Sequence, residues 1–408
     1  MSSPLRVAMI GDRGIPARYS GFSNLVEEVS TRFVANHGID VTVYCRSHYF
    51  DKHPEEYRGV QLAYLPAPGG KSFESLWHSA RAILDAACRR FDLAFVVDPG
   101  NGPLTLPLFL RRMPYVIHTD GLGWQRRKWS AIQRQYYRWS ESISARLATA
   151  LVCDSLAMRE YYLRTYRAES AYIPYGGVAG DPPHEGAPAL FGLEAGRYHL
   201  IVARLEPENN VDLVIREYKA SKARLPLVYV GGARYESDYS HRIFAETDGR
   251  VKCVGPVYES GILNGLYKHC RTYLHGHEVG GTNPSLLRAM AAGAACVPID
   301  VVFHREVLGE QGPFFSKEAG CLAKIIEDLE ADAGKTARLG QDARMRVERF
   351  YRWDAVAAAY AELFSRIVKA RRSGVARARL PAQDVYHPER FIPSGDSGGQ
   401  QTIEKLAE

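Results

Sequence analysis

Residues 275–293 read His275-Gly-His-Glu-Val-Gly-Gly-Thr-Asn-Pro-Ser-Leu-Leu-Arg-Ala-Met-Ala-Ala-Gly293 and join a strand end to a helix through a glycine-rich loop. Asn283 is a favourable N-cap residue, Pro284 suits the first helical position, and Gly293 can end the helix. A strand, a loop and a helix in this order form one βα unit of a parallel sheet. The stretch therefore predicts an α/β fold.

The loop of this unit is also a candidate anion site. Gly280 and Gly281 leave room for a ligand, and Thr282 and Asn283 stand where the helix has free backbone N–H groups. The helix dipole favours a diphosphate there by about 1–2 kcal/mol. The alternative is a well-capped helix that merely follows a tight loop.

The same alternation of apolar runs and amphipathic stretches recurs on both sides of a Pro-rich segment at 181–188. It predicts strands at Leu5–Ile10, Val41–Cys45, Ala94–Val97, Tyr115–Ile117 and Ala150–Cys153, and then at Tyr198–Val202, Leu227–Val230, Val251–Val254, Thr272–His275 and Ala295–Ile299. Helices are expected at about 211–222, at 284–292 and over a long pattern, Val347–Arg372. We therefore expect two Rossmann-like doubly wound domains that face each other across a cleft.

The expected domain boundaries follow from these patterns. They are an N-terminal domain at 1–180, a linker at 181–195, a C-terminal domain at 196–350, a helix at 351–372 that returns to the N-terminal domain, and a mobile tail at 373–408.

Composition excludes several classes of protein. The chain has 408 residues, 46% hydrophobic and 24% charged, which excludes a mainly disordered protein. No apolar run reaches the ~18–20 residues of a membrane span, and no signal peptide is visible, so we expect a cytoplasmic protein. The net charge of +6 is too small to indicate nucleic-acid binding. Seven cysteines without a Cys-x-x-Cys pair favour reduced thiols over disulfides or a zinc site.

Three further segments carry candidate site residues. The loop after the first strand contains Gly14 and Gly21, which allow a tight turn and anion or sugar contact, although it matches neither the dinucleotide nor the P-loop motif. His118 and Asp120 follow the strand at 115–117, at an edge where such sheets present ligand contacts. Arg204 ends the first strand of the second domain, where it can hold phosphate oxygens. The alternatives are a structural histidine and an arginine paired with Glu206 or Glu208.

These segments resemble retaining glycosyltransferases of family 4. The resemblance rests on Gly11-Asp-Arg-Gly-Ile-Pro-Ala-Arg-Tyr19, His118-Thr-Asp-Gly-Leu122, Ala203-Arg-Leu-Glu-Pro-Glu-Asn-Asn210 and His277-Glu-Val-Gly-Gly-Thr-Asn-Pro-Ser-Leu-Leu287, and it runs from about residue 5 to 370. The rhamnosyltransferase-like branch, whose N-terminal domain is of unknown function, is the most similar. It implies the GT-B fold, with a nucleotide-sugar donor on the second domain and an acceptor on the first.

The resemblance also implies roles for individual residues. Catalytic roles fall to His118, Asp120 and Arg204. Donor or phosphate contacts fall to Gly14, Gly21, Arg204, Asn209, Gly280, Gly281, Thr282, Asn283 and Arg288. Arg18, Tyr19, Asp98 and Trp124 lie on the acceptor side.

The chain departs from the family pattern at a few of these positions. Arg288 stands where a glutamate is expected to hold the donor ribose, Asn209 where a lysine is common, and Gly123 where the branch tends to have glutamate. A guanidinium cannot accept the hydrogen bond of a ribose hydroxyl. Either the contacts are rearranged or activity is reduced.

The leading hypothesis is a metal-independent hexosyltransferase that moves a sugar such as rhamnose from a nucleoside-diphosphate sugar to a lipid-linked glycan or natural product, without a cofactor. No Asp-x-Asp pair is present to hold a donor-bound metal. The alternatives are a non-catalytic paralogue that binds a nucleotide sugar or a partner transferase, and a nucleotide-sugar epimerase.

One helical pattern carries a second, smaller hypothesis. Residues 125–139 place Trp129, Ile132, Tyr136 and Trp139 at helical spacing beside several basic residues. An ordinary core-facing helix with a solvated basic face is the simpler interpretation. The functional one is peripheral docking on the cytoplasmic membrane face, near a lipid-linked acceptor.

Overall fold

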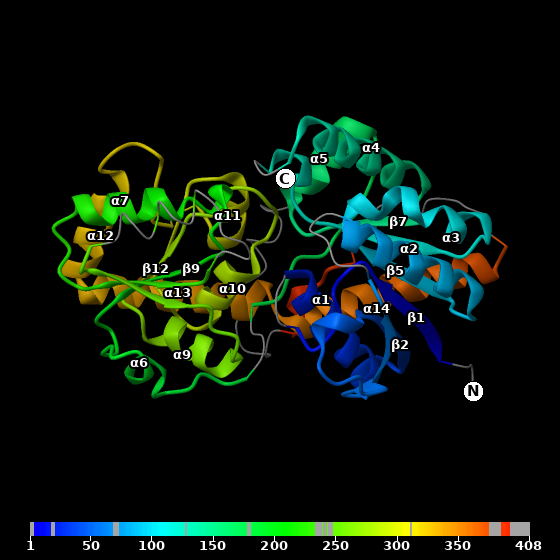
Figure 1. Ribbon diagram of the computed structural model, residues 1–408, viewed down its shortest axis with the longest axis horizontal. Coiled ribbons are helices and arrows are strands. Elements are labelled where there is room, and N and C mark those ends of the chain that lie inside the picture. Colours follow the sequence, from blue (N-terminus) through cyan, green and yellow to red (C-terminus); the bar gives the residue numbers. More distant parts are fainter. Residues whose placement is uncertain are drawn as a thin grey trace.

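The structure is a computed structural model that describes residues 4–17, 21–67, 73–126, 129–177, 181–232, 239, 243, 248–310, 312–374 and 385–391. Two α/β lobes lie side by side (Figure 1), the N-terminal lobe in blue to cyan and the C-terminal lobe in green to yellow. Within the described residues, no helix combines the length and the apolarity that a membrane span requires.

The N-terminal lobe contains an eight-stranded sheet in the order β3-β4-β2-β1-β5-β6-β7-β8. Every neighbouring pair is parallel except β3 and β4. The strands are β1 Leu5–Ile10, β2 Ile39–Arg46, β3 Glu56–Tyr57, β4 Val60–Leu65, β5 Leu93–Val97, β6 Tyr115–Thr119, β7 Ala150–Cys153 and β8 Ala171–Tyr172. β5 is buried over its whole length and β1 over its last four residues, as expected for central parallel strands.

The C-terminal lobe contains a five-stranded parallel sheet in the order β11-β10-β9-β12-β13. Its strands are β9 His199–Val202, β10 Leu227–Val230, β11 Val251–Gly255, β12 Thr272–His275 and β13 Cys296–Pro298. The predicted fold class, two Rossmann-like α/β domains, is confirmed, and all the predicted strands lie within a residue or two of observed ones.

Helices cover both sheets. In the N-terminal lobe they are α1 Gly21–Arg32, α2 Phe73–Cys88, α3 Leu106–Leu110, α4 Ala131–Leu147 and α5 Leu156–Tyr166. In the C-terminal lobe they are α6 Ala187–Leu190, α7 Val211–Ala220, α9 Ser260–His269, α10 Pro284–Ala291, α11 Val302–Leu308, α12 Cys321–Ala331 and α13 Ala333–Phe350, and α14 Trp353–Arg372 follows.

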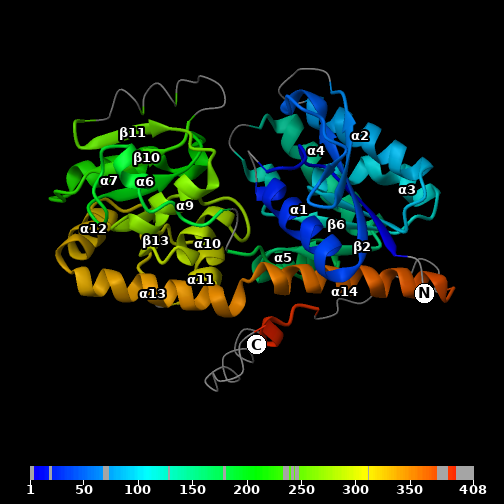
Figure 2. The same ribbon diagram turned by 90° about the horizontal axis from the view of Figure 1, so that it is seen from below.

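The last two helices run end to end beneath both lobes (Figure 2), and α14 returns to the N-terminal lobe. Its Phe364 packs edge-on against Phe33 at a ring separation of 5.6 Å, and Arg32 pairs with Asp354 at 2.8 Å. The predicted single helix Val347–Arg372 is wrong, because the chain turns at Tyr351 and Arg352. There the backbone N–H of Gly177 donates to the Tyr351 carbonyl at 2.8 Å, which ties the turn to the crossing between the lobes.

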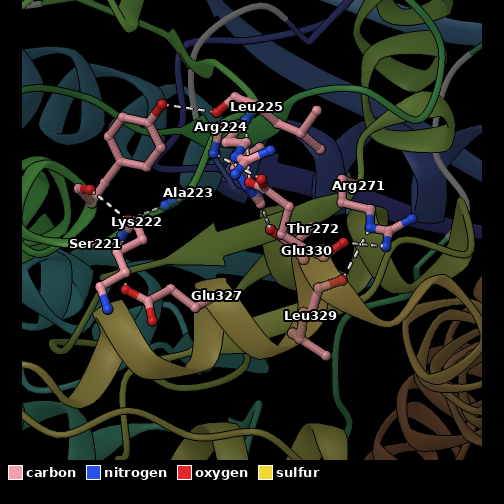
Figure 3. A network of polar contacts seen from close by, with 12 residues as sticks. Ser221, Lys222, Ala223, Arg224, Leu225, Arg271, Thr272, Glu327, Leu329 and Glu330 are labelled. Carbon is pink, nitrogen blue, oxygen red and sulfur yellow. Dashed lines mark hydrogen bonds and ion pairs between the residues drawn. The ribbon is translucent and has the colours of Figure 1, made fainter.

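A polar network anchors α12 to the second sheet (Figure 3). Glu330 accepts hydrogen bonds from His199 at 3.0 Å and from the backbone N–H groups of Arg224 at 2.7 Å and Leu225 at 3.2 Å. Arg271 donates to the carbonyls of Leu329 and Glu330. Burial alone would raise the pKa of Glu330, but these hydrogen bonds outweigh it and lower the pKa to about 2.

Candidate active site

The strand order fixes where a ligand can bind. In the second sheet β9 lies between β10 and β12, and in the first sheet β1 lies between β2 and β5, so each sheet changes winding direction beside its first strand. Ligands of doubly wound sheets bind outside the carboxyl ends of the strands at this switch point. Gly11 and Asp98 follow β1 and β5, and the segments that begin at Ala203 and Gly276 follow β9 and β12.

The start of α10 has the predicted N-cap. The Asn283 side chain accepts the backbone N–H of Ser285 at 3.0 Å and the Ser285 hydroxyl at 2.7 Å, and Pro284 is the first helical residue. Gly280 has a φ of +156°. The loop from Gly276 to Asn283 thus reaches a capped helix N-terminus at the carboxyl edge of the sheet.

Hydrogen bonds join this loop to the segment after β9. Asn209 donates to the carbonyl of Arg204 at 2.8 Å, and its side-chain oxygen hydrogen-bonds with Nδ1 of His277. The backbone N–H of Glu278 donates to the carbonyl of Glu208 at 3.0 Å. These contacts place the exposed Arg204 beside the glycine loop.

Arg204 belongs to a group of charged residues from both lobes. Desolvation in the cleft lowers the pKa of Arg204, and Arg126 and Arg13 lower it further, against Glu206 and Glu208. Glu206 and Glu208, the partners in the alternative interpretation of Arg204, both act on its guanidinium electrostatically.

Two acidic residues of the N-terminal lobe face this group. Burial raises the pKa of Asp120 to about 6, against the opposing effects of Arg126 and Arg204, and Asp98 raises it as well. Burial also raises the pKa of Asp98, whose side chain accepts the backbone N–H of Gly100 at 2.8 Å. Arg126 interacts electrostatically with both carboxyl groups and with Glu208 of the second lobe.

Glycines let the lobes touch across the cleft. A methyl group on Gly121 would lie 2.3 Å from Cα of Gly280, and one on Gly281 would lie 1.9 Å from Oδ1 of Asp154. The Thr282 hydroxyl donates to the backbone carbonyl of Asp154. The glycine loop thus packs directly against the carboxyl ends of β6 and β7.

Gly14 and Gly21 have more local surroundings. Gly14 has a φ of +112°, and a methyl group there would lie 2.5 Å from Sγ of Cys45. Gly21 starts α1, and a methyl group there would lie 3.0 Å from the ring of Pro284. Gly14 shapes the turn after β1, and Gly21 brings α1 up to the start of α10.

His118 is enclosed rather than exposed. It is fully buried, its Nδ1 hydrogen-bonds with the Tyr360 hydroxyl at 2.8 Å, and Phe22 and Tyr175 pack edge-on against its ring. Burial lowers its pKa to about 3, so the ring is neutral. In this structure His118 joins β6 to α14, and its sugar contact remains a prediction.

Arg288 points away from the glycine loop. Its guanidinium donates to the side-chain oxygen of Asn264 and to the carbonyl of Ser260 at 3.1 Å, both on α9. Ser260 and Asn264 in turn hydrogen-bond with Asp181 of the chain between the lobes. Arg288 therefore makes these hydrogen bonds with α9, on the side of the connecting segment, and its donor contact remains a prediction.

A cavity of about 670 Å³ lies between the lobes. Trp124 lines it, donates to the Tyr161 hydroxyl at 3.3 Å, and has the Arg138 guanidinium 4.1 Å above its ring. The other lining residues are Gln125, Ala131, Arg134, Gln135 and Arg138 from one lobe, and Glu278, Val279 and Val301 from the other. Arg18 and Tyr19, predicted on the acceptor side, lie outside the described residues.

Sequence reasoning missed three residues of this cleft. Arg126 belongs to the basic residues of 125–139, for which the pattern predicts a solvated face, and the sequence predicts no role for His277. Asp154 follows β7 in no recognisable motif, yet its carboxyl group is fully buried against Gly281. Its position directly after a predicted strand was the one available signal.

Comparisons with known proteins agree with this architecture. Residues 23–176 match the glycosyl transferase 4-like domain, and residues 196–332 match glycosyl transferases group 1. The chain belongs to the family 4-like glycosyltransferases with the GT-B fold. A search of curated proteins finds no match.

Solved structures similar to this glycosyltransferase share its fold at low identity. Sucrose-phosphate synthase from Thermosynechococcus elongatus is 18% identical, with a TM-score of 0.74 over 90% of this chain and 100% of that chain. Anabaena HepE in complex with UDP-glucose is 14% identical, with a TM-score of 0.70 over 89% of this chain and 100% of that chain. A glycosyltransferase from Rickettsia africae is 12% identical, with a TM-score of 0.63 over 90% and 100%.

Within the part of the chain that the structure describes, no three His, Cys, Asp or Glu side chains are grouped to hold a metal ion. Arg126 and Arg204 are cationic groups that act electrostatically on His277 of the glycine loop.

Proposed function

We propose that this glycosyltransferase transfers a sugar, with retention of configuration, from a nucleoside-diphosphate sugar to a hydroxyl group of an acceptor. The observation that carries the proposal is the capped N-terminus of α10 beside Arg204 at the switch point of the second sheet. The binding of UDP-glucose by Anabaena HepE, a structural neighbour, supports a donor of this class.

The proposed reaction depends chiefly on stabilising the leaving diphosphate. As the bond from the sugar to the phosphate oxygen breaks, negative charge grows on that oxygen. Backbone N–H groups of the loop before α10 and the guanidinium of Arg204 would stabilise this charge. Because these groups are already oriented, they need not reorganise during the reaction, and such electrostatic stabilisation is usually the largest single contribution to catalysis. A metal ion is not needed for this role, and we expect none.

The acceptor is proposed to enter from the N-terminal lobe. Asp120 and Asp98 interact there with Arg126, and Trp124 and Gln125, which follow Asp120 in the sequence, line the cavity between the lobes. Asp120 would orient the acceptor hydroxyl toward the sugar. Rhamnose is the first sugar to test, because the sequence resembles the rhamnosyltransferase-like branch most.

A thermal-shift screen tests the proposal. UDP-glucose, dTDP-rhamnose, GDP-mannose and the free diphosphates are each added to the protein. A ligand at 100 times its Kd stabilises the folded state by about 2.7 kcal/mol, which raises Tm by several degrees. A rise for one nucleotide family supports the proposal, and no rise with any of them contradicts it.

Activity separates the enzyme from its alternatives. Release of the nucleoside diphosphate from the bound donor, by transfer or slow hydrolysis, indicates a transferase. A donor that binds but stays unchanged indicates a non-catalytic paralogue. A donor recovered as its stereoisomer indicates an epimerase.

We also propose that α4 docks on an anionic membrane surface. Ile132 is 83% exposed and Trp139 53% exposed, and Arg134 lies between them in the sequence. Ile132 and Trp139 do not face the core as the simpler interpretation predicts, whereas Tyr136 is half-buried and donates to the Gly100 carbonyl at 3.0 Å. The side of α4 that carries Ser144 is buried, and the Ser144 hydroxyl donates to the Pro99 carbonyl at 3.1 Å. Arg127 and Lys128 lie outside the described residues.

Vesicle sedimentation tests this docking. Phosphatidylglycerol vesicles should sediment the wild type at low salt and release it at high salt, because the Debye length falls from roughly 30 Å at 0.01 M to 3 Å at 1 M. Ile132→Glu combined with Trp139→Glu should abolish sedimentation. Binding that neither salt nor these substitutions change would contradict docking by α4.

A further inference from the structure

His277 occupies a defined position between the arginine segment and the glycine loop. Its Nδ1 hydrogen-bonds with the side-chain oxygen of Asn209, whose side-chain nitrogen donates to the carbonyl of Arg204 at 2.8 Å. This second bond assigns the amide orientation, so the Asn209 side-chain oxygen accepts a hydrogen bond from the Nδ1–H of His277. In the neutral ring Nδ1 therefore carries the hydrogen, and Nε2 is the nitrogen that can gain a proton.

Nε2 lies next to the proposed diphosphate site. A methyl group on Gly280 would lie 3.1 Å from Nε2, so the imidazole sits against the loop that leads into α10. His277 is partly exposed, whereas His275 and His304 behind it are buried. Its neighbours Glu278 and Val279 line the cavity between the lobes.

Burial, together with nearby cationic groups, keeps His277 neutral in the ligand-free protein. Burial is the largest cause and lowers its pKa to about 3. His304 of α11, Arg126 of the N-terminal lobe and Arg204 also lower the pKa, whereas a backbone hydrogen bond with Val279 raises it.

Two further imidazoles stand behind the ring. The His275 ring lies 6.1 Å from that of His277 and 4.9 Å from that of His304. Nδ1 of His275 hydrogen-bonds with the Tyr273 hydroxyl, and Nδ1 of His304 hydrogen-bonds with the Ile299 carbonyl. Because these two rings are buried and tied to the protein, His277 is the member of the group that a ligand can reach.

We propose that His277 binds the donor diphosphate in its protonated form, so that each nucleotide sugar binds together with a proton. The inference rests on the proposed function, since it requires a diphosphate at Arg204. An anion there neutralises the cations that repel a proton from His277 and adds an attraction of its own. Nε2 then gains the proton and donates it as a charge-assisted hydrogen bond to a phosphate oxygen.

Calorimetry in buffers of different ionisation enthalpy measures this proton directly. The probe is whichever of UDP-glucose, dTDP-rhamnose or GDP-mannose raises Tm most. A nucleotide sugar is used because its diphosphate, unlike a free nucleoside diphosphate, has no group that titrates near neutral pH. At pH 6.5 the wild type should take up as much as about one proton per bound ligand.

His277→Asn is the informative variant. An asparagine amide can still donate to Asn209 from the position of Nδ1, but it has no group that titrates. It should abolish proton uptake and weaken binding on the order of tenfold at pH 6.5, with a smaller loss at pH 8.5. His53→Asn, the same change at an exposed histidine of the N-terminal lobe, is the matched control and should change neither.

Each outcome has a distinct meaning. Binding with proton uptake in the wild type and none in His277→Asn supports the inference. Binding of the wild type without uptake, or equal uptake in the variant, overturns it and leaves the proposed function standing. Failure of all three nucleotide sugars to bind overturns the proposed function, and this inference with it.

Discussion

Replacing Gly281 by alanine should block the contact between the glycine loop and the N-terminal lobe. The added methyl group would lie 1.9 Å from Oδ1 and 2.4 Å from Oδ2 of Asp154. Ordinary contact requires about 3.4 Å, so the loop or the carboxylate must move by about 1.5 Å. Asp154 is fully buried and its carbonyl accepts the Thr282 hydroxyl, which leaves the loop as the part that moves.

The expected magnitude follows from overpacking and from the position of the loop. Inserting a methyl group into a closely packed contact costs about 1–3 kcal/mol. If this cost destabilises only the closed, reactive arrangement of the two lobes, kcat/KM should fall by roughly 5- to 150-fold. Displacing the loop also moves the N-terminus of α10 relative to Arg204. Donor turnover should therefore fall more than thermal stability does.

A double-mutant cycle assigns the loss to this one contact. Asp154→Ala removes both oxygens, and among the described residues neither oxygen has a hydrogen-bond partner to leave behind. The double variant should recover most of the lost kcat/KM, with a coupling energy of about 1–2 kcal/mol. Gly249→Ala is the control, because a methyl group there has no atom within 4 Å. Full activity of Gly281→Ala, or no recovery in the double variant, would refute the reasoning.

Three other substitutions follow from the same structure. Glu330→Gln should lower the free energy of unfolding by about 2 kcal/mol at pH 7. Because the pKa of Glu330 is lower in the folded state than in the unfolded state, this difference should shrink as pH falls from 4.5 towards 2. Urea titrations that give equal differences between wild type and variant at pH 7 and pH 3 would contradict this. Arg204→Ala should weaken nucleotide-sugar binding by about 10- to 100-fold in calorimetry while Tm of the free protein changes little, and unchanged affinity would place the diphosphate elsewhere. Tyr360→Phe removes the hydrogen bond to His118 and should cost about 1 kcal/mol of stability by denaturant titration, whereas an unchanged midpoint would mean that the buried pair contributes nothing.

The sequence predicted the parts of the fold that depend on local patterns. Apolar runs such as Leu5–Ile10 and Leu227–Val230 are buried strands, and the Asn283-Pro284 pair is the helix start that its chemistry implies. It missed β3, β4 and β8. Of these, β3 and β8 have two residues each and lie at the sheet edges, and β4 alternates buried Val60 and Leu62 with more exposed residues.

The directions of long side chains could not be predicted in the same way. Arg288 lies on the helix that carries the glycine loop, but its direction is set by Asn264 of α9, which periodicity does not reveal. His118 lies in the strand as predicted. The Tyr360 hydroxyl that hydrogen-bonds with it, however, belongs to a residue 242 positions further along the chain. Such pairings depend on how separate elements pack.

The most direct measurement is a crystal structure of the protein with its nucleotide sugar bound. The account predicts that the diphosphate lies within hydrogen-bond distance of the Arg204 guanidinium and the backbone N–H groups that precede α10. A diphosphate bound elsewhere in the cleft, with Arg204 turned toward solvent, would contradict it.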